Sequence, residues 1–465
     1  MLALLPLPLA AAAVAGSIVA ASAAVYPPLV LTILAFSVPL QDSFVLPIAG
    51  LTLTATEAAL GLAVLAWFFS GALHRELRLS APWLLAPLGI FVAALVASTS
   101  AAPVLQLGLK EAVKWMEFGV VVVLGVALLK TPRDVIIVSA GMLLAGVGEA
   151  LYGLNQAGAG VGPLGFLLGG GILRAFGHFG QPNPFAAYAA MTAVLALGLV
   201  VALVSRDPRS LLRPWGIAIA AVLLTALAAI VASFSRSALF AVATGMVFIV
   251  GAKGGRALLG LGLGGLGAAA LWLFGASELL PPVLTGRLSI VFDYFSVFDA
   301  RQVVLTADNF AIVQRMAIWQ SAWEMFLDNP LLGVGLGNFD HAYPAYSLPG
   351  WLHLPGHAHN YYLNLLAETG ILGLSAYLAL LLPLAITSVV CARTVGRTAV
   401  AAADKTAGAL LYGVALAFPG LLAMLTVHHL FDNLYVHGMI VHVALALCLA
   451  LAARRIAGGQ GQVRN

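Results

Sequence analysis

The sequence predicts an all-α integral membrane protein, a bundle of about twelve transmembrane helices with one large loop outside the membrane. The first reason is composition: 62% of the 465 residues are hydrophobic and only 9% are charged, whereas a soluble domain carries about 25% charged residues. The second is that many windows of about 18 residues hold no charge, which is enough for a helix to cross a hydrocarbon core of roughly 30 Å. The third is one long segment, about 276–361, that is too polar to be buried in lipid.

Hydropathy gives the candidate spans. They lie near 7–24, 28–40, 51–73, 82–98, 116–129, 134–153, 185–204, 215–233, 237–252, 257–275, 362–390, 406–428 and 434–453. The first two are short and interrupted by proline, so we expect one span and a re-entrant piece there. The first segment has no basic region before it, which predicts a retained helix rather than a cleaved signal peptide. The two cysteines, Cys391 and Cys448, fall in or beside spans and are given no role.

Lysine and arginine predict the orientation, because they gather in cytoplasmic loops. The connectors hold 15 of the 22 cationic residues. These connectors are 74–80, 130–134, 205–214, 251–256, 391–405 and the tail from 453. They alternate correctly with the spans, so all are expected on the cytoplasmic side. The chain, residues 1–465, is then one membrane domain with the loop at about 276–361 on the outer side.

Seven cations remain on the outer side, where insertion preference does not explain them. They are Lys110, Lys114, Arg174, Arg236, Arg287, Arg301 and Arg315. Arg236 lies in "ASFSRSALF", at a turn between two spans, and a guanidinium matches phosphate in a bidentate fork. The alternative for Arg236 is an arginine that snorkels to the interface. Together the seven predict a vestibule suited to a multiply charged anion.

Two outer segments carry some of these cations. Residues 310–330 have apolar residues at helical spacing and predict an amphipathic helix over the membrane surface, which carries Arg315. The alternative for Arg315 is the solvated face of that helix. The glycine-dense loop around Arg174 continues into Gln181 and Asn183 at the start of a span, so its backbone amides are expected close to a ligand.

The stretch "GHAHNYYLNLLAETGILGL", residues 356–374, predicts a general base. His359 lies beside a helix N-terminus, whose positive dipole end disfavours a protonated imidazole, and a neutral imidazole can accept a proton. Asn360, Asn364 and Glu368 follow on one face of the helix, and Gly370 with Gly373 predicts close helix packing. His357 and His359 have two alternatives, a loop pair without function and a zinc site. Zinc is disfavoured because no carboxylate or cysteine lies close by in sequence.

Several classes of enzyme are disfavoured by what the sequence lacks. It holds no DxD or paired-carboxylate motif in an outer loop, which argues against metal-dependent glycosyltransferases and two-carboxylate glycosidases. Asp42 stands alone in the first loop. No nucleotide-binding fingerprint occurs, so no cofactor and no nucleic-acid partner are expected. An activated group must therefore arrive on the membrane itself.

Four blocks resemble the O-antigen ligase superfamily, in the same order. They are "GQPNPFAAY" (180–188), "FSRSALF" (234–240), "QRMAIWQSAWEMFLDNPLLGVGLGNF" (314–339), and His359-Asn360 followed after nine residues by Gly370-x-x-Gly373. The superfamily includes O-antigen ligases, related polysaccharide polymerases and protein O-oligosaccharyltransferases. The similarity extends over most of the chain from about residue 50.

The resemblance implies a membrane glycosyltransferase of the GT-C type in the bacterial inner membrane, with a large periplasmic loop. Such enzymes move a glycan from undecaprenyl diphosphate to an acceptor hydroxyl without a metal; for a ligase the acceptor is lipid A–core. His359 matches the essential histidine of the family, and Arg236 and Arg315 match its arginines. The residues predicted to bind substrate are Arg174, Lys110, Lys114, His357, Asn360, Gln181 and Asn183.

Three functions stay open on the sequence. A ligase is preferred. A polymerase, or an enzyme that glycosylates a protein serine, would use the same machinery on another acceptor. A transporter of lipid-linked glycans belongs to a different class, and it is disfavoured because transporters place their charged residues near the membrane midplane.

Overall fold

The computed structural model describes residues 21–22, 25–48, 51–74, 80–254, 260, 262, 298–306, 309–352, 356–399 and 404–462. The predicted spans at 7–24 and 257–275 lie almost wholly outside these residues. Residues 276–297 of the predicted loop, with Arg287, lie outside them too.

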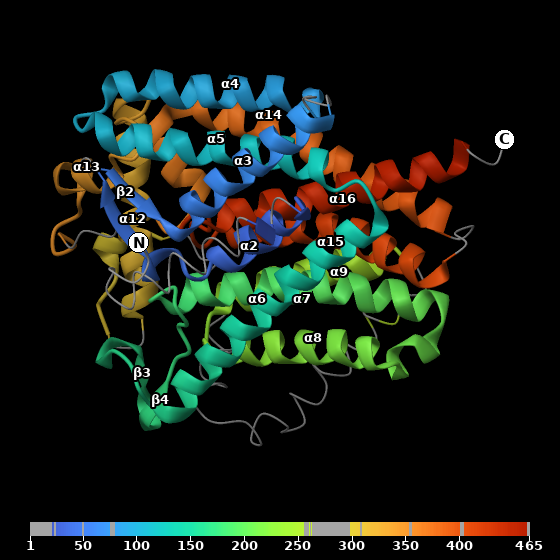
Figure 1. Ribbon diagram of the computed structural model, residues 1–465. Coiled ribbons are helices and arrows are strands. Elements are labelled where there is room, and N and C mark those ends of the chain that lie inside the picture. Colours follow the sequence, from blue (N-terminus) through green and yellow to red (C-terminus); the bar gives the residue numbers. More distant parts are fainter. Residues whose placement is uncertain are drawn as a thin grey trace, which may run out of the picture.

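The described part of the chain is a bundle of long helices, with shorter helices and loops gathered at one end (Figure 1). The helices are α2 (Leu29–Ser37), α3 (Ala55–His74), α4 (Pro82–Ser98), α5 (Leu105–Leu128), α6 (Pro132–Ala159), α7 (Pro182–Arg206), α8 (Pro214–Ala232), α9 (Arg236–Gly251), α12 (Phe310–Asp328), α13 (Phe339–Tyr346), α14 (Tyr361–Thr398), α15 (Lys405–His428) and α16 (Met439–Gln462). Short 3₁₀ turns occur at Gln41–Ser43, Thr99–Ala101, Leu164–Phe166, Gly169–Gly171, Pro208–Leu212 and Ala300–Gln302.

Eight of the described helices are long and apolar enough to cross a membrane: α3, α4, α6, α7, α8, α14, α15 and α16. The protein is therefore a multi-pass membrane protein. Helix α9 has 16 residues and is shorter. Helix α5 has 24 residues, but Lys110, Glu111, Lys114 and Glu117 all lie on it. Helix α2 has only 9 residues, about 14 Å, and is too short to cross alone. The total of twelve spans stays a prediction.

Local sequence explains where several helices begin. Thr131 and Asp134 form a capping box at the start of α6, in which each side chain accepts from the other residue's backbone N–H. Proline occupies the first position of α6, α7 and α8, where its missing N–H costs nothing. Asp404 caps α15 by accepting from the backbone N–H groups of Thr406 and Ala407. These signals set the helix ends at the connectors.

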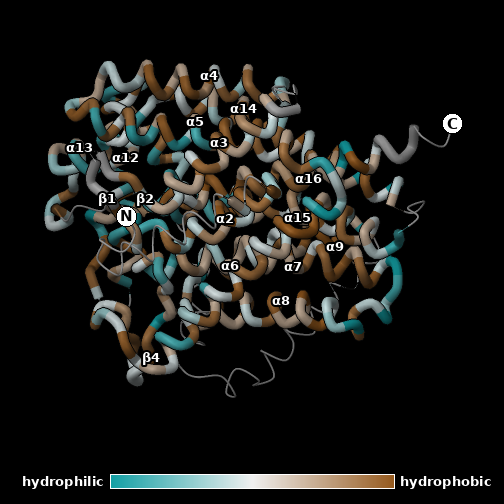
Figure 2. Tube along the Cα trace, viewed as in Figure 1, coloured by the Kyte–Doolittle hydropathy of each residue, from teal (hydrophilic) through white to brown (hydrophobic). Residues whose placement is uncertain are grey.

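Helices α7, α15 and α16 form the centre of the bundle. In the most apolar window 78% of the residues of α7 and of α16 are buried, against 22% for α3 and α8 at the rim. Helix α7 approaches α15 closely at Gly198 and Gly413: a Cβ added at Gly198 would lie 2.6 Å from the carbonyl oxygen of Gly413. Figure 2 shows apolar residues along the helices, with polar residues gathered towards the loops at both ends.

Two small hairpins differ from the all-helical prediction. Strands β1 (Val45–Ile48) and β2 (Leu51–Thr54) pair antiparallel, and so do β3 (Leu167–Leu168) and β4 (Ile172–Leu173). Hydropathy alone cannot separate a short apolar strand from a helix, so it placed 51–54 inside a span. Helix α5 also begins at Leu105, eleven residues before the predicted span, because the charged residues there are helical although they are not apolar.

The ends of the bundle differ in their contents. The loops α4–α5, α6–α7, α8–α9 and α15–α16 meet at one end, together with α12, α13 and the start of α14; we call this the site end (Figure 1). The C-terminal ends of α3, α5, α7, α9 and α14 lie at the other end, with the starts of α4, α6, α8 and α15. The described parts of the cation-rich connectors, which are predicted to share one side of the membrane, thus share one end of the bundle.

Helix α14 is broken at Gly370, and residues 330–338 dock into the break. Gly370 has φ +61° and ψ −163° inside the helix. The backbone N–H of Ile371 donates to the carbonyl of Pro330, and that of Gly335 to the carbonyl of Glu368. A Cβ at Gly370 would lie 2.4 Å from backbone atoms of Leu331. The glycine therefore admits a loop, and not the neighbouring helix expected from its spacing with Gly373.

Candidate active site

The loop before α14 holds His359 in a fixed, strained conformation. His359 has φ +48°, which L-residues rarely adopt. Asn360 caps α14 by accepting from the N–H of Leu363 at 3.1 Å. One turn on, Asn364 Oδ1 accepts from the N–H of Ala358 at 2.9 Å. Both asparagines thus fix the loop to the first turns of α14. Backbone strain of the kind seen at His359 is common at functional sites. The predicted position of His359 beside a helix N-terminus is confirmed.

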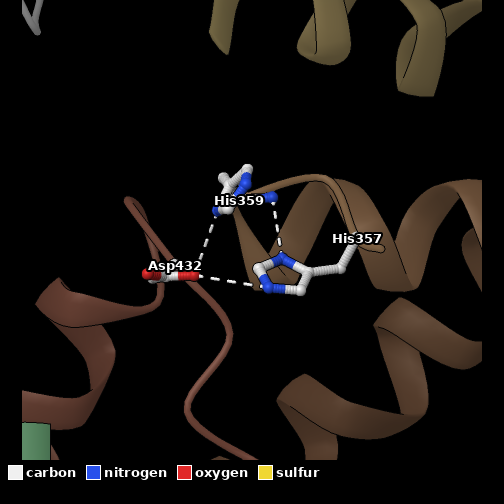
Figure 3. A group of neighbouring side chains, drawn as sticks. All are labelled: His357, His359 and Asp432. Carbon is white, nitrogen blue, oxygen red and sulfur yellow. Dashed lines mark hydrogen bonds and ion pairs between the residues drawn. The ribbon is translucent and has the colours of Figure 1, made fainter. Parts of the chain in front are cut away.

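His359, His357 and Asp432 form one cluster (Figure 3). His359 Nδ1 lies 3.3 Å from Asp432 Oδ1, and His357 Nε2 lies 3.6 Å from the same oxygen. The two imidazole rings meet edge to face with centroids 4.4 Å apart. Asp432 comes from the loop between α15 and α16, 73 residues further along the chain. The cluster joins two loops of the site end.

His357 is held as a neutral imidazole. The backbone N–H of His359 donates to His357 Nδ1 at 3.1 Å, so the ring proton of the neutral form must lie on Nε2, facing Asp432. Burial lowers the pKa of His357 to about 4, and the charges of His359 and Arg315 act in the same direction while Asp432 opposes them. His357 therefore orders the loop without adding a charge near neutral pH.

Asp432 is a buried carboxylate that remains ionised. Burial alone would raise the pKa of Asp432, but the hydrogen bond with His359, and the positive charges that His357 and His359 carry when protonated, hold it well below its ordinary value. Its Oδ1 also accepts from the N–H of Asn433 at 2.9 Å, and its Oδ2 accepts from Asn183 Nδ2 at 2.9 Å. Since only 4% of Asp432 is exposed, its charge acts mainly on the two histidines.

Asn183 connects Asp432 to Arg174. Arg174 Nη2 donates to Asn183 Oδ1 at 3.3 Å, and Arg174 Nε donates to the carbonyl of Ser233 at 2.7 Å. Ser233 follows the last residue of α8. The structure thus brings together Arg174, Asn183, His357 and His359 of the predicted residues. Asp432 connects them.

A second histidine–carboxylate pair fixes the loop that carries Arg174. His178 Nδ1 lies 2.7 Å from Oε2 of the buried Glu149, and the N–H of His178 donates to Glu149 Oε1 at 2.7 Å. Gln156 Oε1 accepts from the N–H of Gly177 at 2.8 Å. Helix α6 thereby sets the path of the chain into α7, and so places Asn183.

The two arginines predicted to be catalytic also lie at the site end. Arg315 is half-buried on α12, and its positive charge reaches the His357 ring. The predicted helix at 310–330 is confirmed as α12, which buries one face that includes Val313 and Met316. Arg236 is the first residue of α9, three positions after Ser233. The left-handed conformation of Phe234, with φ +52°, turns the chain between them.

Buried polar groups close to Arg315 have no hydrogen-bond partner among the described residues. They are the indole N–H of Trp319, one helical turn beyond Arg315, and both ring nitrogens of His428, the last residue of α15. Buried polar groups are otherwise almost always paired, with protein or with ordered water. Each of these groups therefore calls for a polar partner such as an ordered water.

The remaining predicted residues lie further from the cluster. Lys114 pairs with Glu111 at 2.6 Å and donates to the carbonyl of Tyr435 at 3.1 Å, so it secures the α15–α16 loop. Lys110 is exposed on α5, and Gln181 is exposed before α7. A role for these three in binding substrate stays a prediction.

Sequence reasoning missed Asp432. Its signal was a single acid in "HHLFDNLYVHG", a loop between two apolar spans, but only residues near His359 in sequence were considered as its partners. No carboxylate lies close to the histidines in sequence, but the fold brings Asp432 to them in space, which removes that argument against zinc. Asp42, the lone acid of the first predicted loop, pairs with His437 of the loop that carries Asp432.

The cluster also bears on metal binding. One donor atom each from His357, His359 and Asp432 lie within 4.8 Å of one another, and two imidazoles with a carboxylate are a set that binds zinc. In the observed arrangement, however, His357 Nδ1 and His359 Nδ1 are used in hydrogen bonds within the loop and to Asp432. The three residues could nevertheless bind a metal ion. The prediction that the protein uses no metal therefore rests on the resemblance alone.

The geometry equips His359 as a base. With Nδ1–H directed to Asp432, the unprotonated nitrogen is Nε2, and the side chain is 31% exposed. A carboxylate behind the ring stabilises the imidazolium that forms when Nε2 takes a proton. Arginines at the same end of the bundle favour an anion beside this base.

Comparison with known protein families gives a match to part of the chain. Residues 220–378 match the O-antigen ligase family, which confirms the resemblance over that segment. The segment runs from α8 into α14 and includes Arg236, Arg315, His357 and His359. It indicates a glycosyltransferase of the O-antigen ligase or polymerase type that acts on lipid-linked glycans. No curated protein matches the chain.

Proposed function

We propose that the chain is an O-antigen ligase of the bacterial inner membrane. It transfers a polysaccharide from undecaprenyl diphosphate to a sugar hydroxyl of lipid A–core, with the site end facing the periplasm. The observation that carries the proposal is the pairing of His359 with the buried Asp432, at the end of a membrane-spanning bundle that also holds Arg174, Arg236 and Arg315. The family match over residues 220–378 supports it.

In the proposed reaction His359 Nε2 takes the proton of the acceptor hydroxyl. The hydroxyl oxygen attacks the anomeric carbon of the donor, and the bond from that carbon to the diphosphate oxygen breaks. Undecaprenyl diphosphate leaves with the bonding electrons, and direct displacement inverts the anomeric centre. A positioned base contributes about 10²- to 10⁴-fold to such a step.

The arginines neutralise the departing diphosphate. This leaving group needs no general acid once its charge is balanced, so cations replace the second carboxylate of a glycosidase. Arg236 and Arg315 are the proposed diphosphate ligands, because a guanidinium binds two phosphate oxygens at once. Arg174, which is hydrogen-bonded to Asn183, adds a further positive charge to the site. Lys110, Lys114, Gln181 and Asn360 complete the proposed substrate-binding set.

The test is transfer by the purified protein in liposomes with lipid-linked polysaccharide and lipid A–core. His359→Ala is expected to lower the rate at least 100-fold, while wild-type activity persists in EDTA. His341→Ala is the matched control, because His341 is an exposed histidine on α13 of the same loop region. Equal rates for both variants would remove His359 from the mechanism, and loss of wild-type activity in EDTA would instead assign the cluster to a metal.

A polymerase is the second candidate, since the same groups can act on another lipid-linked repeat unit. A deletion strain complemented with the gene separates the two. A ligase restores polysaccharide on lipid A, and without it full-length chains remain on undecaprenyl diphosphate. A polymerase instead restores the long chains themselves.

A further inference from the structure

A cavity of ≈ 940 Å³ lies at the end of the bundle opposite to His359. Its floor is α15, and its walls are the C-terminal ends of α7 and α9 and the second half of α14. Its lining combines basic residues at the helix ends with apolar residues along the helices. Helix α7 has 25 residues and is about 37 Å long, so the cavity cannot belong to the candidate active site.

The mouth of the cavity is strongly cationic. Arg206, Lys253, Arg393 and Arg397 line it, and no Asp or Glu is present among the described lining residues. Burial and the neighbouring charge of Arg206 lower the pKa of Lys253 to about 8. Crowded cations without a counter-charge repel one another, and a bound anion relieves that repulsion.

Lys253 is held in place over the cavity wall. Its Nζ lies 4.3 Å from the centroid of the Tyr412 ring, within the range of a cation–π contact. Helix α14 lies close to the same ring at Gly396, where an added Cβ would be 2.8 Å from Tyr412 Cε2. The cation is therefore placed by packing, which differs from a lysine that extends freely into solvent.

The walls behind these cations are apolar and open towards the lipid. Val247 and Phe248 of α9 are 42% and 57% exposed, and Val389 of α14 is 40% exposed. Leu416 and Pro419 of α15 lie between them. A ligand that matches the cavity thus has an anionic head at the membrane surface and apolar chains along the helices.

Orientation signals do not account for this arrangement. Cations in short cytoplasmic connectors need only be present in the loop. Arg209, Arg213 and Lys405 meet that requirement at the same end of the bundle and do not line the cavity. The four lining cations instead converge on one space from α7, from α14 and from the turn after α9.

We propose that this cavity binds an anionic glycerophospholipid of the surrounding leaflet. Lys253, Arg206, Arg393 and Arg397 contact its phosphate, and its acyl chains lie along Val247, Phe248 and Val389. Basic pockets between transmembrane helices are known to take such headgroups. The proposal requires only that the chain spans a membrane, so it stands apart from the proposed enzymatic function.

The test compares lipid binding by two charge-matched variants with native mass spectrometry of the purified full-length protein. The cavity variant carries Arg206→Gln, Lys253→Gln and Arg393→Gln; the control carries Arg209→Gln, Arg213→Gln and Lys405→Gln. Phosphatidylglycerol is expected to bind wild type and control at least tenfold more tightly than the cavity variant, and phosphatidylethanolamine is expected to show no such difference. Equal loss in both variants, or equal binding of both lipids, overturns the proposal.

A competition with inorganic phosphate separates a lipid from a free anion. Phosphate at millimolar concentration is expected not to displace phosphatidylglycerol; full displacement would assign the cations to a free anion and overturn the proposal of a lipid. If the triple variant does not fold, the single variants Lys253→Gln and Arg397→Gln are used, each with an expected threefold loss of affinity. Unchanged affinity in both single variants contradicts the proposal.

Discussion

Asp432 controls which nitrogen His359 presents to a substrate. Its Oδ1 lies 3.3 Å from His359 Nδ1, so the proton of the neutral ring stays on the inner nitrogen and the outer one is free to accept. Asn183 and Asn433 hold the carboxylate in turn. The carboxylate therefore acts through His359 and does not itself need to touch the substrate.

Asp432→Asn is expected to lower kcat about 10- to 1,000-fold and to leave KM within about threefold, because the amide still fills the space but no longer stabilises the imidazolium. Asp432→Glu should recover part of the loss. The measurement is steady-state transfer in liposomes. Asp42→Asn, another loop carboxylate that pairs with a histidine, is the control and should keep a normal kcat. A rise in KM alone for Asp432→Asn would assign this residue to substrate binding instead.

His357 predicts how stability depends on pH. Its pKa is lowered by burial to about 4 in the folded protein, whereas an unfolded chain titrates near 6.5. Between these values the unfolded state binds more protons, so stability falls as pH falls from about 6.5 to about 4. His357→Gln should flatten this part of the Tm-versus-pH curve, measured in detergent. An identical slope in the variant would exclude His357 as its source.

Side chains near one another in sequence were predictable and side chains brought together by folding were not. The helix N-terminus beside His359 follows from "HAHNYYLN", because an asparagine before an apolar run is a capping signal. The contacts of Asp432 with His359 and Asn183 cross 73 and 249 residues. No periodicity or spacing encodes them, because they depend on how the helices cross.

At the scale of elements, α14 is two helical pieces joined at Gly370. The conformation of Gly370 lies in a region of φ and ψ that is open essentially only to glycine. A further hydrogen bond joins the first residue of α13 to α14: the backbone N–H of Phe339 donates to Glu368 Oε1 at 3.1 Å. The break thus fastens α13 and the preceding loop to α14, the helix that follows His359.

Gly370→Ala is therefore expected to lower the Tm by several degrees and to reduce transfer, since the new methyl meets the backbone of Leu331 and the backbone strain costs roughly 1–3 kcal/mol. The measurement is thermal unfolding in detergent beside the transfer assay. Gly148→Ala on α6 is the matched control: nothing lies within 4 Å of the added Cβ, so its Tm should stay the same or rise. A Tm for Gly370→Ala equal to that of the control contradicts the proposed role of the break.

Helix positions followed from hydropathy where the segments are uniformly apolar. The predicted spans 185–204 and 406–428 agree with α7 and α15 within a few residues. Hydropathy did not predict the start of α5, because the charged residues near the N-terminal end of that helix are helical without being apolar. It also failed at β1 and β2, where an apolar run forms a hairpin.

At the scale of the whole molecule, the two ends of the bundle differ in their charged residues. The site end gathers His359, Asp432 and the outlying arginines, and the opposite end carries the connectors rich in lysine and arginine. Electrostatics alone predicts that this opposite end faces the cytoplasm. The candidate active site would then open to the outside of the cell membrane.

Cysteine labelling checks this orientation. The native Cys391 and Cys448 are both buried, so they give little background. Leu164→Cys, at an exposed position of the α6–α7 loop, is expected to react with a membrane-impermeant maleimide in intact spheroplasts. Arg209→Cys, in the α7–α8 connector, should react only after permeabilisation. The reverse pattern would place the site end in the cytoplasm and remove access to a periplasmic acceptor.

The position of Asp432 between α15 and α16 also bears on biogenesis. A ribosome delivers His359 and the arginines to the translocon well before it delivers the loop that orients His359. Until α15 and α16 insert, the imidazole lacks its partner, and an immature chain should be catalytically silent. Nascent protein would thus gain the proposed activity only once these two helices have assembled with the rest of the bundle.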